Sequence, residues 1–368
     1  MHVGLNLVYL VPGETGGMEV YARELIPALL AEDDGDIRFT AFVSREAAAA
    51  DGPWRDMPSV TVPVRSANRA EWVRGEQLLL PRLAAARGVD LVHSLATTAP
   101  GWGRFRRVTT IHDLHYRTIP EAHFGVRALG MRVLVPLSAR RSHRVIADSQ
   151  ATRDDVVEYL RVPPARVDVV HLGLGRRAQV EPRPFDAGGR RLLLTAAAKR
   201  PHKNLAALLD ALALLPAADR PLLVLPGYPT PHEAELKQRA QALGITGDVR
   251  FLGWVDDGAM EGLYAAADAF VFPSLSEGFG LPVLEAMARG VPVACSNRPP
   301  MTEVAGVAAL LFDPTRPRAI ADAVGRLLGD DALRSRLRAV GPAHAARFTW
   351  SATARATLRS YRETFRSH

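Results

Sequence analysis

The chain has 368 residues, 48% of them hydrophobic, a length and composition that favour two domains with separate cores. The formal net charge of +7 raises the question of nucleic acid or an anionic membrane as a partner. The basic residues are dispersed and form no run interleaved with stacking aromatic side chains. These features exclude a nucleic-acid-binding protein.

Location can also be predicted from the sequence. No apolar run reaches the length of a membrane span, and residues 1–6 show no basic leader. Cys295 is the only cysteine, which suits a reducing cytoplasm. We therefore expect a cytoplasmic protein. Peripheral contact with the inner face of the membrane stays open, because six arginines fit either a lipid-facing patch or a solvated face: Arg104, Arg106, Arg107, Arg140, Arg141 and Arg144.

The first half of the chain alternates strand and helix patterns. Residues 3–10 predict a strand, residues 12–17 a flexible turn that contains Gly16 and Gly17, and residues 18–30 a helix. Further strands are predicted at residues 39–43, 91–93, 108–111, 145–147 and 167–170. This alternation predicts a Rossmann-like domain over residues 1–175.

Two pairs of ionisable side chains stand out in this half of the chain. His112 and Asp113 directly follow the strand predicted at residues 108–111, so we expect them at the carboxyl edge of the sheet. Asp34 and Asp36 lie in an acidic loop after a helix. We interpret that loop as a solvated turn rather than a metal site, since no cluster of histidine and cysteine ligands accompanies it.

The second half repeats the pattern after a linker. Residues 176–189 are rich in proline, glycine and charge, which is typical of a linker. A second domain is predicted over residues 190–349, and a last helix over residues 350–368. Strands at residues 191–198, 222–226, 249–253, 270–272 and 291–294 alternate with helices at 204–215, 232–243 and 260–267. The order predicts a parallel sheet covered on both faces.

Cations gather where the first strand of this domain ends. Two of the three lysines, Lys199 and Lys203, lie within five residues on either side of Arg200. Cations between the carboxyl end of a strand and the start of a helix suit a pyrophosphate. The alternative is an ordinary charge cluster at a helix entry.

Two carboxylates flank the next strand-to-helix junction. Glu277 is predicted on the loop after the strand at residues 270–272, and Glu285 in the first turns of a helix that begins near Pro282. Amides at a helix start bind anions, and neighbouring carboxylates accept hydrogen bonds from hydroxyls. Phosphate on the amides and hydroxyls on the glutamates describe a nucleotide sugar.

Residues 276–293 resemble the Glu-x7-Glu segment of the retaining family 4 glycosyltransferases. The resemblance implies the GT-B fold, in which two doubly wound, Rossmann-like domains face each other across a cleft. It implies that Glu277 binds hydroxyls of the donor sugar and that Glu285 binds the ribose. Backbone contacts to the donor would come from Gly278, Phe279, Gly280 and Leu281.

The resemblance extends to other segments and implies a role for each. Lys203 would neutralise the leaving diphosphate, while Arg200 or Lys199 would replace the arginine that many members carry. Trp254 and Val255 would frame the base; the alternative for Trp254 is packing in the core. Gly16 and Gly17 would let donor phosphate and acceptor approach the backbone. His112 would hydrogen-bond the sugar or the acceptor, with Asp113 orienting it or contacting the acceptor; the alternative for His112 is a structural histidine whose hydrogen bonds are satisfied within the protein. The last helix would cross back onto the first domain.

The implied activity is retaining transfer of a hexose-like sugar from a nucleoside diphosphate to a hydroxyl of a saccharide, a lipid-linked glycan or a small natural product. Neither a metal nor another cofactor is expected, since Lys203 and helix amides would neutralise the diphosphate. Two alternatives stay open: an isomerase or phosphorylase of the same architecture, and a non-catalytic module that binds nucleotide sugars.

Overall fold

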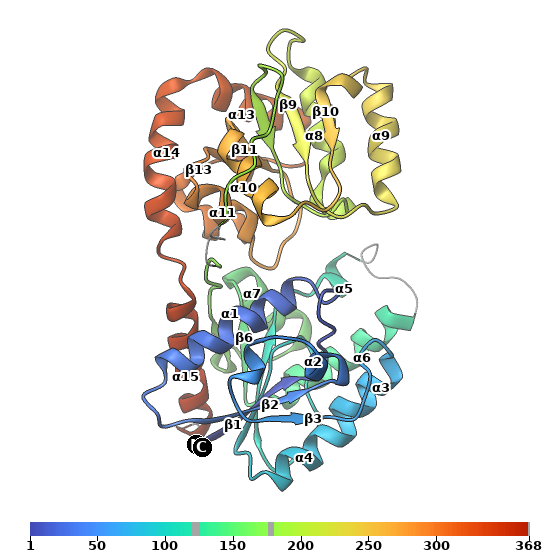
Figure 1. The fold of residues 1–368 in the computed structure, drawn as a ribbon, viewed down its shortest axis with the longest axis vertical. Coiled ribbons are helices and arrows are strands. Elements are labelled where there is room, and N and C mark those ends of the chain that lie inside the picture. The colour runs from blue at the N-terminus through green and yellow to red at the C-terminus, as the bar shows by residue number, and fades with distance from the viewer. Residues whose placement is uncertain (120–125, 176–179, 367–368) are drawn as a thin grey trace. The chain divides into compact units, whose positions relative to one another are not determined.

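The protein forms two compact α/β units in a computed structural model that describes residues 1–119, 126–175 and 180–366. Unit 1 comprises Met1–Gly175 and Phe348–His368, and unit 2 comprises Arg176–Arg347. Each unit is a parallel sheet flanked by helices (Figure 1). The predicted fold class, two Rossmann-like domains, is confirmed.

Unit 1 is built on a seven-stranded sheet with the order β3-β2-β1-β4-β5-β6-β7. Its strands are β1 (His2–Leu7), β2 (Arg38–Val43), β3 (Ser59–Thr61), β4 (Leu91–Ser94), β5 (Arg106–Ile111), β6 (Arg144–Ala147) and β7 (Val167–Val169). Its α-helices are α1 (Gly17–Glu32), α2 (Arg45–Ala49), α3 (Arg69–Arg74), α4 (Leu80–Ala86), α5 (His115–Thr118), α6 (Val126–Arg141), α7 (Gln150–Leu160) and α15 (Trp350–Arg366).

Unit 2 is built on a six-stranded sheet with the order β10-β9-β8-β11-β12-β13. Its strands are β8 (Leu192–Leu194), β9 (Leu222–Leu225), β10 (Val249–Phe251), β11 (Ala269–Phe272), β12 (Val293–Ser296) and β13 (Ala309–Phe312). Its α-helices are α8 (Leu205–Leu214), α9 (His232–Ala242), α10 (Asp257–Ala266), α11 (Leu281–Ala288), α12 (Met301–Ala305), α13 (Pro317–Gly329) and α14 (Asp331–Ala345).

The strands of unit 2 are apolar on both faces, and this explains why helices cover both. Side chains alternate along a strand. Leu193 and Val271 therefore pack with α8, α9 and α13 in one core cluster. On the opposite face, Phe270 lies with its ring 6.2 Å from that of Tyr264 in α10. Continuous apolar strands of this kind require a parallel sheet buried on both sides.

The last helix, α15, belongs to unit 1. The Tyr361 hydroxyl lies 2.7 Å from Nδ1 of His93 in β4, and Ser360 donates to Asp168 in β7 over 2.6 Å. At the start of α15 the backbone approaches so closely that a Cβ on Gly173 would lie 2.2 Å from the Trp350 amide nitrogen. Glycine at position 173 is therefore needed for this approach. Residues 367 and 368 of the predicted helix lie outside the described residues.

The segment predicted as a linker is packed against unit 2 over part of its length. Residues 176–179 lie outside the described residues. The Arg183 amide donates to the Gly258 carbonyl over 2.9 Å, and Arg250 donates to the Asp186 carbonyl over 2.9 Å. This proline-containing, charged stretch is therefore an extended segment that hydrogen-bonds to α10 and β10.

The strand bounds differ from the sequence prediction mainly at β8. The predicted strand ran from residue 191 to 198, whereas β8 ends at Leu194. Residues 195–198 lie beyond the strand, although the Thr195 amide still donates to the Val224 carbonyl over 3.2 Å. The chain then turns towards the loop after β9, where the Ala197 carbonyl oxygen would lie 2.6 Å from a Cβ on Gly227. Alanines fit a strand or a tight turn equally well, so composition did not reveal the end.

The contact between residues 180–189 and α10 can be tested with one methyl group. A Cβ on Gly262 would lie 1.7 Å from the Arg183 carbonyl oxygen, so we expect Gly262→Ala to lower the free energy of unfolding by about 1–3 kcal/mol. Gly247→Ala is the matched control, since nothing lies within 4 Å of its Cβ position. Urea unfolding of both variants measures the difference. Equal stability of the two would contradict the packing described.

Candidate active site

The strand order of unit 2 reverses between β8 and β11. Loops that leave such neighbouring strands in opposite directions open a crevice at the carboxyl edge of the sheet. Lys203 comes from the loop after β8 and Glu277 from the loop after β11. The structure brings the two together, with Lys203 Nζ 2.6 Å from Glu277 Oε1. The side chains are 17% and 11% exposed, so water screens the pair only partly.

Backbone geometry fixes the position of Lys203. Asn204 adopts the left-handed conformation with φ 58°, and its side-chain amide donates to the carbonyls of Pro273 (3.1 Å) and Pro314 (2.7 Å). The Leu275 amide donates to the His202 carbonyl over 2.8 Å. Together these bonds tie the Lys203 loop to the Glu277 loop.

The Glu277 loop enters α11 through a glycine. Gly280 has φ 112°, and a Cβ there would lie 2.1 Å from Cε of Met301. Phe279 is buried and anchors the loop. Pro282 lies in the first turn of α11, where the amide that proline lacks has no partner within the helix. The start of α11 carries the positive end of the helix dipole beside Glu277.

Glu285 lies one turn further along α11 in a more apolar setting. Burial raises the pKa of the Glu285 carboxyl, although Arg289 and the Tyr264 hydroxyl act in the opposite direction. The Tyr264 hydroxyl donates to Glu285 Oε2 over 3.1 Å. Arg289 forms a partly buried ion pair with Glu261 and lies 4.5 Å from the centre of the Tyr264 ring. These contacts orient the Glu285 carboxylate.

Lys199 and Arg200 prove to be different kinds of residue. The Lys199 side chain is fully buried, and its ammonium donates to the carbonyls of Gly227 (2.5 Å) and Leu252 (2.6 Å). Burial lowers the pKa of Lys199, while Glu233 opposes the shift. Lys199 therefore joins the loops after β8, β9 and β10, and which of Lys199 and Arg200 contacts a phosphate stays a prediction. Arg200 is exposed, so its side chain is accessible to a ligand.

Trp254 and Val255 follow β10 at the same edge of the sheet. The Trp254 side chain is not part of the core, since the residue is 62% exposed. The Gly253 carbonyl accepts a hydrogen bond from the Gly227 amide over 3.1 Å. This bond ties the loop after β10, which carries the exposed Trp254 indole, to the loop after β9, whose Gly227 carbonyl also accepts from Lys199. An exposed aromatic ring can stack on a planar base.

In unit 1, the glycine-rich turn leads from β1 to α1. Gly16 has φ 65° and is the N-cap of α1, and nothing lies within 4 Å of a Cβ built on Gly16 or Gly17. The Gly13 amide donates to Glu19 Oε2 over 2.7 Å, which closes the turn onto the helix. The two glycines therefore leave the backbone open to a ligand.

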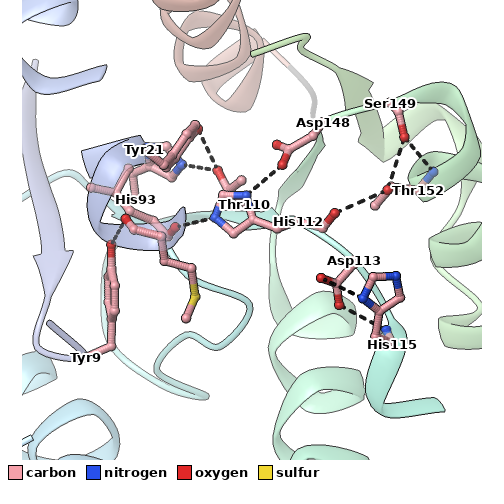
Figure 2. Close-up of polar contacts among 12 residues, drawn as sticks. Tyr9, Tyr21, His93, Thr110, His112, Asp113, His115, Asp148, Ser149 and Thr152 are labelled. Carbon is pink, nitrogen blue, oxygen red and sulfur yellow. Dashed lines mark hydrogen bonds and ion pairs between the residues drawn. The ribbon is translucent and has the colours of Figure 1, made fainter. Parts of the chain in front are cut away.

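His112 and Asp113 follow β5 as predicted, and they do not share a hydrogen bond with each other in Figure 2. His112 Nδ1 lies 2.7 Å from Asp148 Oδ2, and its Nε2 lies 3.0 Å from the Leu95 carbonyl oxygen. Asp113 instead accepts from the His115 amide over 2.9 Å. Burial lowers the pKa of His112, but the Asp148 carboxylate and the two hydrogen bonds outweigh it, so the net shift is upward.

The remaining candidates differ in exposure, and two of the arginines have structural contacts. Of the six arginines considered above, Arg107 is buried, and Arg144 pairs with Asp168 over 2.6 Å; the exposed ones are Arg104, Arg140 and Arg141. Asp34 and Asp36 are both exposed. Within residues 1–119, 126–175 and 180–366, no group of three His, Cys, Asp or Glu side chains could hold a metal ion. Over the same residues, we find no helix both long and apolar enough to span a bilayer.

Comparison with known proteins agrees with this architecture. Residues 15–174 match the family model "Glycosyltransferase Family 4", and residues 179–343 match "Glycosyl transferases group 1". The chain is 34% identical to the O-antigen chain mannosyltransferase B of Escherichia coli over 70% of each chain. It is 33% identical to the D-inositol 3-phosphate glycosyltransferase of Frankia alni over 95% of each. The solved sucrose-phosphate synthase of Thermosynechococcus elongatus superposes with a TM-score of 0.79, at 20% identity, over the whole of both chains.

The chain therefore belongs to the group 1 glycosyltransferases of the GT-B superfamily, and it is a glycosyltransferase. Three residues of the site were missed from the sequence: Asp148, Asn204 and Tyr264. Asp148 follows β6 directly, as His112 follows β5, and this position was a signal that could have revealed it. Asn204 ends the lysine-containing segment that resembles the family, but its contacts, like that of Tyr264, are tertiary and could not be read from the local sequence.

The two carboxylates near Arg289, those of Glu285 and Glu261, should change stability in opposite directions when they are neutralised. Because the folded-state pKa of Glu285 is raised, its ionisation costs stability as pH rises through that pKa. Glu285→Gln should therefore stabilise the protein at pH 8, and the gain should vanish at low pH. Glu261→Gln should instead leave Arg289 without its partner and destabilise by about 3 kcal/mol. Urea unfolding at several pH values tests both. Destabilisation by Glu285→Gln at pH 8 would contradict the assignment.

Proposed function

We propose that the protein is a retaining hexosyltransferase that moves a sugar from a nucleoside diphosphate to an acceptor hydroxyl without a metal ion. The observation that carries donor binding is the contact of Lys203 with Glu277 at the strand-order reversal of unit 2. Retention of configuration rests on the family resemblance alone. The ammonium suits a diphosphate, and the carboxylate suits sugar hydroxyls. Glu285, in the next turn of the helix, suits a ribose.

The proposed reaction is a front-face displacement. The bond between C1 of the sugar and the phosphate oxygen breaks, and a bond between C1 and the acceptor oxygen forms on the same face. The departing phosphate takes the proton of the acceptor hydroxyl. Lys203 and the amides at the start of α11 stabilise the charge that develops on the phosphate. Arg200, exposed on the same loop, supplies a second cation.

One named relative is a mannosyltransferase, and this supports a hexose as the transferred group. The other is a D-inositol 3-phosphate glycosyltransferase, a name that does not specify the transferred sugar. A non-catalytic sugar-nucleotide module and a GT-B isomerase or phosphorylase are the competing possibilities. Incubation with a panel of nucleotide sugars, with and without acceptors, separates them. Release of nucleoside diphosphate together with a glycosylated acceptor supports transfer, whereas binding without release supports a module.

Glu277 should be essential to turnover. We expect Glu277→Ala to reduce kcat by on the order of 10²–10³-fold, because a charged hydrogen-bond partner of the transition state is lost. Glu235→Ala is the control, since that side chain is 72% exposed on α9. Circular dichroism should show the same fold for both variants. Near-wild-type kcat for Glu277→Ala at saturating donor would refute the role.

Metal independence follows from the proposed use of Lys203 as the counterion of the diphosphate. We expect full activity after exhaustive treatment with EDTA and after transfer into metal-free buffer. The measurement is initial rate with the donor found in the panel. Loss of activity on chelation, with recovery on adding Mg²⁺ or Mn²⁺, would show that the diphosphate site is assigned wrongly.

A further inference from the structure

Both ring nitrogens of His112 face hydrogen-bond acceptors. The Leu95 carbonyl oxygen, 3.0 Å from Nε2, can only accept, so Nε2 must carry a proton. On the other side of the ring, Nδ1 lies 2.7 Å from Asp148 Oδ2, and an ionised carboxylate can also only accept. A neutral imidazole has a single N–H and cannot donate to both. The geometry is that of a doubly protonated ring beside a carboxylate.

The setting of Asp148 favours the same distribution of charge. Its side chain is 3% exposed, and in the part of the chain that the structure describes Oδ1 is buried without a hydrogen-bond partner. A buried carboxylate with one unsatisfied oxygen is stabilised by a cation in contact with its other oxygen. The imidazolium of His112 is in contact with Oδ2 and is such a cation.

Two ionisable neighbours of the His112 ring, His93 and Tyr21, do not change charge near neutral pH. His93 in β4 is buried, and both burial and the charge of His112 lower its pKa, to about 3. Tyr21 in α1 packs edge-on against the ring at 4.8 Å, and burial, together with Asp148, raises its pKa. Asp113, the next residue, acts in the same direction as Asp148. His93 and Tyr21 are therefore uncharged at neutral pH. Figure 2 shows both residues together with His112.

We propose that Asp148 is a positioning residue that keeps His112 as a fixed cation. His112 then donates a hydrogen bond from Nε2 to a substrate oxygen, shared with or moved from the Leu95 carbonyl, and does not accept a proton during turnover. This assignment rests on the proposed transfer reaction for its role, but the charge state itself does not. This role requires a positively charged imidazole, whereas general-base catalysis requires a neutral imidazole.

The pH dependence distinguishes the two roles. A histidine whose folded-state pKa is raised contributes stability that is complete below its unfolded-state pKa and is lost as pH rises through the folded one. If turnover needs the His112 cation, kcat falls as the pH rises through the pKa of His112. If His112 were a base, kcat would fall on the acid side instead.

The experiment combines residue-resolved ¹⁵N NMR of the imidazole nitrogens with kcat against pH. In the wild-type protein we expect two protonated nitrogens on His112 at pH 7. Asp148→Asn should lower the midpoint pH of the His112 titration. It should also reduce kcat at pH 8 by about ten- to a hundredfold, because one charge-assisted hydrogen bond is lost. Asp154→Asn, an exposed carboxylate on α7, is the control and should change neither quantity.

His112→Gln provides a second variant that keeps a donor without the charge. We expect a similar loss of kcat and no alkaline limb. The proposal is overturned if His112 carries a single proton at pH 7, if Asp148→Asn leaves its midpoint unchanged, or if activity falls on the acid side with that midpoint. If no nucleotide sugar supports transfer, the transferase proposal fails, while NMR of the wild-type protein still decides the charge state.

Discussion

The strand order β8 to β11 is the constraint from which the site in unit 2 follows. Because the connections on either side of these two strands run in opposite directions, their loops are the ones free to approach each other. Lys203 and Glu277 meet there with side chains less than a fifth exposed. Such a pair loses solvation on folding, and the mutual attraction offsets that loss. Under the proposed function, the diphosphate would compete with Glu277 for the ammonium, and the contact with Glu277 would keep the cation oriented in the free protein.

Buried polar groups hold the surrounding loops, and they are distinct from the groups offered to a ligand. In unit 2, Lys199 binds two backbone carbonyls from different loops, and Asn204 binds two others. In unit 1, Glu19 closes the glycine-rich turn. Each contact satisfies a backbone group that the end of a strand leaves unpaired. Loops fixed in this way position functional side chains more precisely than their lack of regular structure would suggest.

The sequence predicted the alternation of strands and helices, the fold class and the contact-forming loops, because periodicity and the positions of strand ends are local properties. It did not separate Lys199 from Arg200. These neighbours point to opposite environments only because β8 stops at Leu194 and the chain then turns against Gly227. The exposure of Trp254 is also decided by the surrounding structure, since an indole after a strand suits either a core or a surface. Adjacency in three dimensions, rather than residue type, decides such cases.

The two glutamates of the motif, Glu277 and Glu285, lie only eight positions apart in sequence, but their surroundings differ. Glu277 accepts from an ammonium, whereas Glu285 accepts from the neutral Tyr264 hydroxyl and has a raised pKa because it is buried. Under the proposed function, ribose hydroxyls would add donors to Glu285. Hydrogen bonds to the charged form favour that form, so binding would lower the pKa and release a proton at pH values near it. The burial that costs stability in the free protein thereby makes Glu285 more responsive to hydroxyl donors than an exposed carboxylate, which water already satisfies.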